Sequence, residues 1–112
     1  MRDTARRIPT ISHLQFLALG LLTGGERPGR VIREVAADFG ARQSAAAFYQ
    51  MMARMERDGL VDGAYEQIMV GDQAVTQRRY RITPPGSRAW SQARAFYEAV
   101  AIAATEERWS RA

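Results

Sequence analysis

The hydrophobic pattern of this chain changes its period once, near residue 60, and that change limits the folds it can adopt. Up to there, apolar residues recur at the spacing of helices. From Leu60 to Met69, and again from Val75 to Thr83, the pattern tends towards alternation, with β-branched and aromatic residues. Gly71-Asp72 lies between the two runs, so the pattern predicts a β-hairpin. Pro84-Pro85-Gly86 then breaks the second run and begins a last helix, expected over roughly residues 86–110.

Cap and turn residues divide the chain before the hairpin into three helices. Ser12 occupies an N-cap position with Gln15 at the capping-box position. Pro suits the first turn of a helix because its missing N–H is not needed there, and Gly suits the position after a helix end. The expected start and stop residues of the three helices are Ser12 and Thr23, Pro28 and Gly40, and Ser44 and Gly59.

The third helix has one apolar face and one polar face. Phe48, Met52 and Met55 recur at helical spacing and form its expected inner face. The second helix ends only a few residues upstream and the hairpin follows directly, which is the element order of a winged helix-turn-helix. The expected fold class is therefore mainly α with one β-hairpin (α+β), followed by a long C-terminal helix. The residues of the third helix and its approach that point outward are Gln43, Ala46, Ala47, Gln50, Arg54 and Arg57.

The last helix is apolar over most of its circumference. Between Ala95 and Ala104 only Glu98 is charged. A monomer of 112 residues has too few other elements to cover so broad an apolar helix, so we expect a second subunit to cover it. The first helix is apolar almost all round and joins the expected interface. The residues assigned to this dimer interface are Leu14, Leu17, Trp90, Ala93, Phe96, Tyr97, Val100, Ala103 and Ala104.

The length of 112 residues allows one compact domain. Residues 1–10 are polar and basic and are expected to form a flexible arm. Residues 11–83 form the expected winged helix-turn-helix domain, and residues 84–112 the expected dimerisation helix. No apolar stretch reaches about 18 residues without a break, and the N-terminus has no signal-like segment. We therefore expect a cytoplasmic protein that does not enter a membrane.

The composition argues against catalysis. The chain has no Cys and a single His, His13, which rules out thiolate zinc sites and leaves little basis for a His-centred triad. No nucleophile–base pair, phosphate loop or metal-ligand spacing is visible, so we expect no enzyme activity, no metal and no cofactor. A net charge of +4 and a pI near 10.3 favour a polyanionic partner. All 16 basic residues are Arg, which also fits the codon bias of a GC-rich genome.

Two segments, SAAAFYQMMARMERDGLV and RRYRITPPG, resemble the PadR-like family of transcriptional regulators. The family shows a capped helix start, an apolar residue followed by Tyr, further apolar positions at helical spacing, a Glu, and a Gly before two apolar residues. Arg30 departs from this pattern, because the family usually has Tyr there. The matching positions are Gly29, Phe48, Tyr49, Met52, Met55, Glu56, Gly59, Leu60, Val61, Tyr80, Ile82, Thr83 and Gly86.

The resemblance implies a homodimeric DNA-binding regulator, often a repressor. Two-fold symmetry would make its operator an inverted repeat. Some family members release DNA when an aromatic or hydrophobic small molecule binds near the dimer interface, and Trp90 is the residue on which such an effector would stack. A Trp at a dimer seam also serves as interface core. The alternative function is a winged-helix scaffold that binds protein and does not bind DNA.

Candidate DNA contacts lie on the third helix and the hairpin. Gln43 and Gln50 offer amides to adenine, and small Ala side chains let a helix sit deep and touch thymine methyl groups. The Tyr49 hydroxyl suits a phosphate, and each Arg–phosphate contact adds about −0.9 to the slope of log affinity against log salt. Each residue also has a plainer explanation, as a solvated side chain, a helix former or a Tyr at the edge of the core. The expected DNA-contacting residues are Arg42, Gln43, Ser44, Ala46, Ala47, Tyr49, Gln50, Arg54, Arg78, Arg79 and Arg81.

Overall fold

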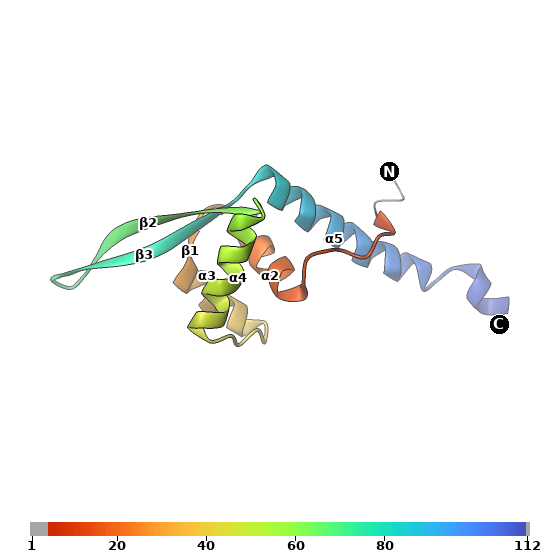
Figure 1. Cartoon of the computed structure of the whole chain (residues 1–112). Coiled ribbons are helices and arrows are strands. Elements are labelled where there is room, and N and C mark those ends of the chain that lie inside the picture. Colours follow the sequence, from red (N-terminus) through yellow and green to blue (C-terminus); the bar gives the residue numbers. More distant parts are fainter. Residues whose placement is uncertain (1–4, 112) are drawn as a thin grey trace.

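A computed structural model describes residues 5–111 and shows a helical body with an arm at each end (Figure 1). The hairpin of β2 and β3 extends from one end and helix α5 from the other. The radius of gyration is 17.4 Å, against about 13 Å for a compact domain of about 100 residues. The elements in chain order are α2 (His13–Leu22), β1 (Arg27–Pro28), α3 (Gly29–Asp38), α4 (Ala45–Arg57), β2 (Val61–Val70), β3 (Gln73–Ile82), α5 (Pro84–Ala103) and a 3₁₀ helix, η1 (Glu107–Arg111).

The structure confirms the α+β fold class, and the three helices and the hairpin lie where the sequence predicts them. The capping box of α2 is complete: the Ser12 hydroxyl accepts from the Gln15 amide at 3.1 Å, and the Gln15 side chain accepts from the Ser12 amide at 2.9 Å. The Ser44 hydroxyl caps α4 by accepting from the Ala47 amide at 3.1 Å, a single bond without the reciprocal one. Gly71, at the tip of the hairpin, has a positive φ of 62°, which Gly adopts without strain.

Strand β1 was not predicted. Its two residues pair with β3, Arg27 opposite Tyr80 and Pro28 opposite Arg79, so the sheet has three antiparallel strands in the order β1-β3-β2. A strand of two residues is too short to show an alternating pattern in the sequence. Pro28 also fits the start of a helix, so nothing in the sequence marked it as part of a strand. Pro28 lies just before α3, as its N-cap, and the helix begins at Gly29.

The last helix begins at the Pro84-Pro85-Gly86 segment, as expected, but its expected C-terminal limit near residue 110 was wrong. Helix α5 begins at Pro84, because two prolines without N–H groups are tolerated in a first turn that Thr83 caps. It ends at Ala103, and the Thr105 hydroxyl donates to the Ile102 carbonyl at 2.8 Å, a local bond that competes with helix continuation. The Trp109 indole then donates to the Ala103 carbonyl at 2.6 Å, which folds η1 back on the helix end.

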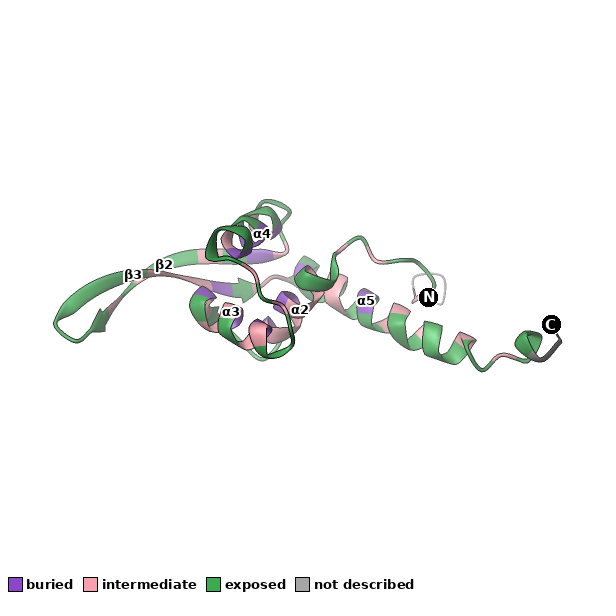
Figure 2. Cartoon of the chain, turned by 90° about the horizontal axis from the view of Figure 1, so that it is seen from below, coloured by how far each residue is buried: buried purple, intermediate pink, exposed green. Residues whose placement is uncertain are grey.

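One core holds α2, α3, α4 and the base of the hairpin together, and buried residues gather at their junction in Figure 2. Met52 and Met55, the expected inner face of α4, and the neighbouring Met51 are buried in this core. The outer hairpin and most of α5 are exposed in the same view. The largest fully buried side chains are Leu19, Leu22, Ile32, Phe48, Met52, Met55 and Val61.

The described part of the N-terminal arm lies beside α5 (Figure 1). Arg6 forms an ion pair of 3.7 Å with Glu106, and Ala5 and Arg6 line a small cavity with Phe96. Residues 1–4 of the expected flexible arm lie outside the described residues. In the part of the chain that is described, no helix is both long enough and apolar enough to cross a membrane.

The start of α5 is fixed against the start of the hairpin by a close contact at Gly86. A Cβ at this position would overlap the carbonyl oxygen of Leu60 and lie 3.0 Å from Ile82. The Thr83 amide donates to the same Leu60 carbonyl at 3.1 Å, and the Thr83 hydroxyl donates to the Gly59 carbonyl. The direction in which α5 leaves the body therefore depends on the absence of a side chain at residue 86.

We expect Gly86→Ala to lower the free energy of unfolding by about 3 kcal/mol, because the added methyl group meets rigid backbone. Gly24→Ala is the matched control, since a Cβ there meets only the end of the Arg27 side chain. Thermal unfolding of both variants checks this. A Gly86→Ala melting temperature as high as that of Gly24→Ala would contradict the close contact.

Candidate nucleic-acid interface

Helix α4 has one exposed face because its opposite face packs into the core. Phe48, Met52 and Met55 are buried, so the side chains on the opposite side of the helix point to solvent. This outward face is small at its start and polar further on, without an aromatic or aliphatic side chain larger than Ala. Its exposed residues are Ala46, Ala47, Gln50, Ala53, Arg54 and Arg57.

The loop before α4 is held by a residue that sequence analysis missed. The Arg33 Nε atom on α3 donates to the Gln43 carbonyl at 3.1 Å. The Gln43 side chain turns towards α4 and lies 4.0 Å from the Met51 sulfur, so it is half-buried. Gln43 is therefore less available than Gln50. Nothing in the local pattern pairs Arg33 with a carbonyl ten residues away.

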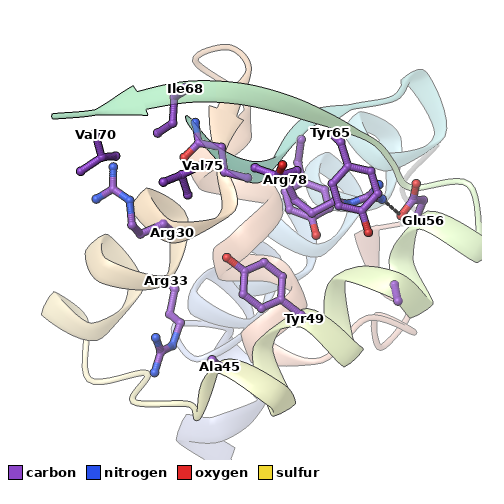
Figure 3. A pocket seen from close by; sticks show the side chains of 14 residues that line it. Arg30, Arg33, Ala45, Tyr49, Glu56, Tyr65, Ile68, Val70, Val75 and Arg78 are labelled. Atoms are coloured by element: carbon purple, nitrogen blue, oxygen red, sulfur yellow. Dashed lines mark hydrogen bonds and ion pairs between the residues drawn. The ribbon is translucent and has the colours of Figure 1, made fainter. Parts of the chain in front are cut away.

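Tyr49 lies at the edge of the core, and its proposed phosphate contact stays a prediction. Its ring packs edge-on against Phe48, with centroids 5.1 Å apart, and covers Gly29, where a Cβ would lie 2.9 Å from the ring. This close approach explains why Gly begins α3. Figure 3 shows the Tyr49 ring beside the cleft that separates the helices from the hairpin, and Tyr49 lines that cleft.

The cleft has a volume of about 1040 Å³ and two unlike walls (Figure 3). The hairpin contributes Ile68, Val70 and Val75, which are apolar. Helix α3 contributes Arg30 and Arg33, and Arg30 forms an ion pair of 3.1 Å with Glu34 on the same helix. The cleft combines an apolar wall with a cationic one, next to the start of α4.

The three arginines of the hairpin, which were expected to contact phosphates, all form ion pairs within the chain. The first, Arg78, lies 2.6 Å from Glu56 of α4. Arg79 lies 3.1 Å from Glu26 and 3.5 Å from Glu66. Arg81 lies 3.2 Å from Asp62. Between residues 61 and 82 the sequence holds three arginines and three carboxylates, so the formal charges of the hairpin cancel.

Arginines without an ion pair among the described residues include three on α4 and in the loop before it. Among the described residues, no carboxylate forms an ion pair with Arg42, Arg54 or Arg57. Arg42 and Arg54 are exposed and belong to the expected contact set. Arg42 and Arg54 are therefore available to an anion, whereas each hairpin arginine already has a carboxylate partner, which for Arg81 is an exposed one.

Protonation states at the base of the hairpin are fixed at neutral pH. Burial raises the pKa of the Tyr80 hydroxyl, and the neighbouring Arg78 guanidinium opposes this only in part. Burial lowers the pKa of Arg78, but its interactions with Tyr80 and Glu56 outweigh that effect and leave the pKa above its ordinary value. Tyr80 is therefore neutral and Arg78 charged. Among the described residues, no group of three His, Cys, Asp or Glu side chains could hold a metal ion.

The residues assigned to the dimer interface lie on α2 and α5. Trp90 stacks on Phe16, with ring centroids 5.8 Å apart, and is half-buried by its own chain. Ala93 departs from the expectation: it is fully buried by its own chain, so it offers no surface to a partner. The exposed members are Leu14, Tyr97, Val100 and Ala104, and the half-buried ones are Leu17, Trp90, Phe96 and Ala103.

The helix order, the exposed face of α4 and the hairpin after it make this a winged helix-turn-helix protein, and the hairpin β2–β3 is its wing. A transcriptional regulator from Clostridium thermocellum has the same fold with a TM-score of 0.64 and 21% identity, over 84% of this chain and 94% of that one. A PadR family transcriptional regulator from Eggerthella lenta has a TM-score of 0.62 and 26% identity, over 81% of this chain and 77% of that one.

The third similar structure is Bacillus subtilis PadR in complex with operator DNA, with a TM-score of 0.55 and 22% identity over 71% of this chain. The match spans 45% of that longer protein. These similarities confirm the resemblance to PadR-like regulators that the sequence motifs indicate, and the three neighbours are transcriptional regulators rather than enzymes. No family model and no curated protein matches the sequence.

If the side chains on the outward face of α4 do not contribute to the fold, replacing them with Ala leaves the stability of the protein unchanged. We expect Gln50→Ala and Arg54→Ala each to alter the free energy of unfolding by less than about 0.5 kcal/mol. Met52→Ala, on the buried face of the same helix, should lower it by about 2–5 kcal/mol. Urea unfolding of the three variants measures both effects. A loss at Gln50 or Arg54 as large as that at Met52 would show that this face is part of the fold.

Proposed function

We propose that this protein is a sequence-specific DNA-binding transcriptional regulator that binds an inverted-repeat operator as a homodimer. The observation that carries the proposal is the outward face of α4, which is exposed and has no ion pair with a carboxylate in the described part of the chain, while the opposite face is fully buried. A helix held in this way can enter the major groove without disturbing the core. The neighbour bound to operator DNA has the same fold, which supports the proposal.

The side chains of α4 suit base contacts. Ala46 and Ala47 let the helix approach the bases closely, and Ala can touch a thymine methyl group. Gln50 follows one turn later and can form two hydrogen bonds to adenine. Arg54 and Arg42 carry the free positive charge, while Ser44 is occupied by its cap. Tyr49 offers its hydroxyl to a phosphate from the edge of the wing cleft.

The second part of the proposal is a dimer formed through α5 and α2. Helix α5 extends beyond the body, and its apolar residues stay exposed: 40% of Tyr97 and 51% of Val100. A second copy that packs along this helix would bury them and place two α4 helices on one side of a duplex. Because the two copies would be related by two-fold symmetry, the two half-sites would be inverted.

The resemblance to PadR-like regulators further supports a repressor that a hydrophobic or aromatic effector releases from DNA. Trp90 is our candidate for the effector contact, because it is half-buried at the junction of α2 and α5. Phe16 stacks on its indole, and the Arg94 guanidinium lies 5.6 Å from the ring. An effector that stacks there would act on the angle between the helical body and the dimer helix. The expected location of such a regulator is the cytoplasm.

Selection of bound sequences from random duplex DNA should enrich an inverted repeat whose half-site centres lie about one helical turn, or a multiple of it, apart. Replacing Gln50 and Arg54 together with Ala should weaken binding to the selected duplex by about tenfold or more, because each good base contact contributes about 1–3 kcal/mol of discrimination. Binding to a mixed duplex should fall much less. Fluorescence anisotropy with both duplexes measures the ratio.

Arg88→Ala is the control for this pair, since it removes an exposed arginine from α5 and should leave the ratio unchanged. Equal losses on both duplexes for the Gln50 and Arg54 variant would contradict base recognition by α4. A selection without enrichment, combined with no retention on heparin, would favour the alternative of a protein-binding scaffold. The charge-neutral wing with its exposed Met69 and Val70 is the observation that keeps that alternative open.

The dimer has its own test. Val100→Glu should weaken self-association by about 100-fold or more, because each copy would bring an unpaired carboxylate into an apolar contact. Ser91→Glu adds the same charge to the polar side of α5 and should leave the dimer intact. Sedimentation equilibrium of the two variants and the parent chain measures their self-association. A Val100→Glu variant that stays dimeric would move the interface away from α5.

A further inference from the structure

Arg78 occupies an enclosed position between the wing and α4. Its guanidinium lies 2.6 Å from the Glu56 carboxylate and 4.5 Å above the centre of the Tyr65 ring, and only 23% of its side chain is exposed. Figure 3 shows Arg78 stacked beside Tyr65 with Glu56 next to it. Gly63 makes room for this arrangement, because a Cβ there would collide with the guanidinium and lie 3.1 Å from Glu56. We call Glu56, Tyr65 and Arg78 the wing clamp.

We propose that Arg78 is a positioning residue: through the wing clamp it fixes the angle of the wing against the end of α4 and does not contact DNA phosphate. The inference rests on the proposed DNA-binding function. It reassigns one of the cations that sequence analysis placed on the DNA backbone.

Among the described residues, the clamp is the outermost ion pair between the wing and the helices. Tyr65 and Arg78 lie opposite each other in the sheet. Farther out, the described side-chain hydrogen bonds and ion pairs of the wing stay within it, such as that of Gln77 with Glu66. The core ends closer to the base, at Val61 and Tyr80. Without the clamp, the hairpin could bend from its base.

A small rotation at the clamp has a large effect at the tip. Gly71 is six residues beyond Tyr65, which is about 20 Å of strand at about 3.3 Å per residue. A bend of about 10° therefore moves the tip by about 3 Å, as far as the length of a hydrogen bond. The outer wing carries neutral polar side chains, such as Gln67 and Thr76, whose contacts with DNA depend on such placement.

The chemistry of the clamp opposes a phosphate contact. A charged hydrogen bond and a cation–π contact already use the guanidinium, and the hydrogen bond lies in a partly buried site. To reach a phosphate, Arg78 would have to leave Glu56 without its cation in a half-buried site, which is costly. Lys could not replace it, because the planar guanidinium stacks on a ring while donating in its plane.

The test compares Arg78→Gln and Glu56→Gln with Arg42→Gln, an exposed arginine before α4 without an ion pair among the described residues. Full-length chains are titrated onto the selected duplex over a range of salt concentrations. We expect both clamp variants to weaken binding by about tenfold, the loss of about 1.4 kcal/mol, while the salt slope of the parent chain is retained. Arg42→Gln should make the slope shallower by about 0.9.

The direction in which Glu56→Gln changes the DNA affinity distinguishes a role in the wing clamp from that of a solvated carboxylate near DNA. If Glu56 were a solvated carboxylate near DNA, removing its charge would strengthen binding; as part of the clamp, its removal weakens binding. A second readout needs no DNA. The chain has no Cys, so spin labels can be placed at Asp72→Cys in the tip and Glu34→Cys in α3, with excess unlabelled chain present.

In the spin-label measurement we expect a narrow distance distribution for the parent chain and a broad one for both clamp variants. An unchanged distribution, an unchanged affinity, or a shallower salt slope for Arg78→Gln would each overturn the proposal. Thermal unfolding confirms that the variants are folded. If the parent chain binds no duplex, the proposed function fails, whereas the distance measurement still tests the clamp.

Discussion

The burial of one face of α4 is the constraint on which the rest of the structure depends. Phe48, Met52 and Met55 are fully enclosed by α2, α3 and the base of the wing, and no rotation of the helix could expose them without losing several kcal/mol. The opposite face is thereby turned to solvent and kept rigid. The same core also holds Val61 and Tyr80, so the wing leaves the body at a position set by the packing of α4. A helix and a hairpin that share one core move as a unit.

The fold could be predicted from the sequence because its elements begin and end with local chemistry. Ser12 and Ser44 cap helices by bonds to amides three residues on, and the positive φ of Gly71 allows the turn of the hairpin. The exposed face of α4 followed from the same periodicity. The charge pattern of the wing could not be predicted, because Arg78 finds its carboxylate 22 residues away in another element. Ala93 was misjudged for the same reason, since burial by the chain's own fold leaves no trace in the helical pattern.

The distribution of charge gives α4 and the wing different roles. Free cations and an exposed amide lie on α4, where they can meet an anionic duplex and its base edges. The three arginines of the wing form ion pairs with Asp62, Glu66, Glu26 and Glu56. Such pairs contribute little to stability when exposed, but they fix geometry where they are partly buried. In this account, α4 supplies recognition and the wing supplies a surface of defined orientation.

The account depends most directly on two copies of α4 facing one duplex. Because the chain has no Cys, a DNA-cleaving chelate can be attached at Arg57→Cys, on the outward face of α4 but outside the proposed contact set, with Asp38→Cys at the exposed end of α3 as the control position. The account predicts two cleavage clusters from position 57, related by the dyad of the bound sequence and about one helical turn apart or a multiple of it. A single cluster, or cleavage no stronger than that from position 38, would contradict it.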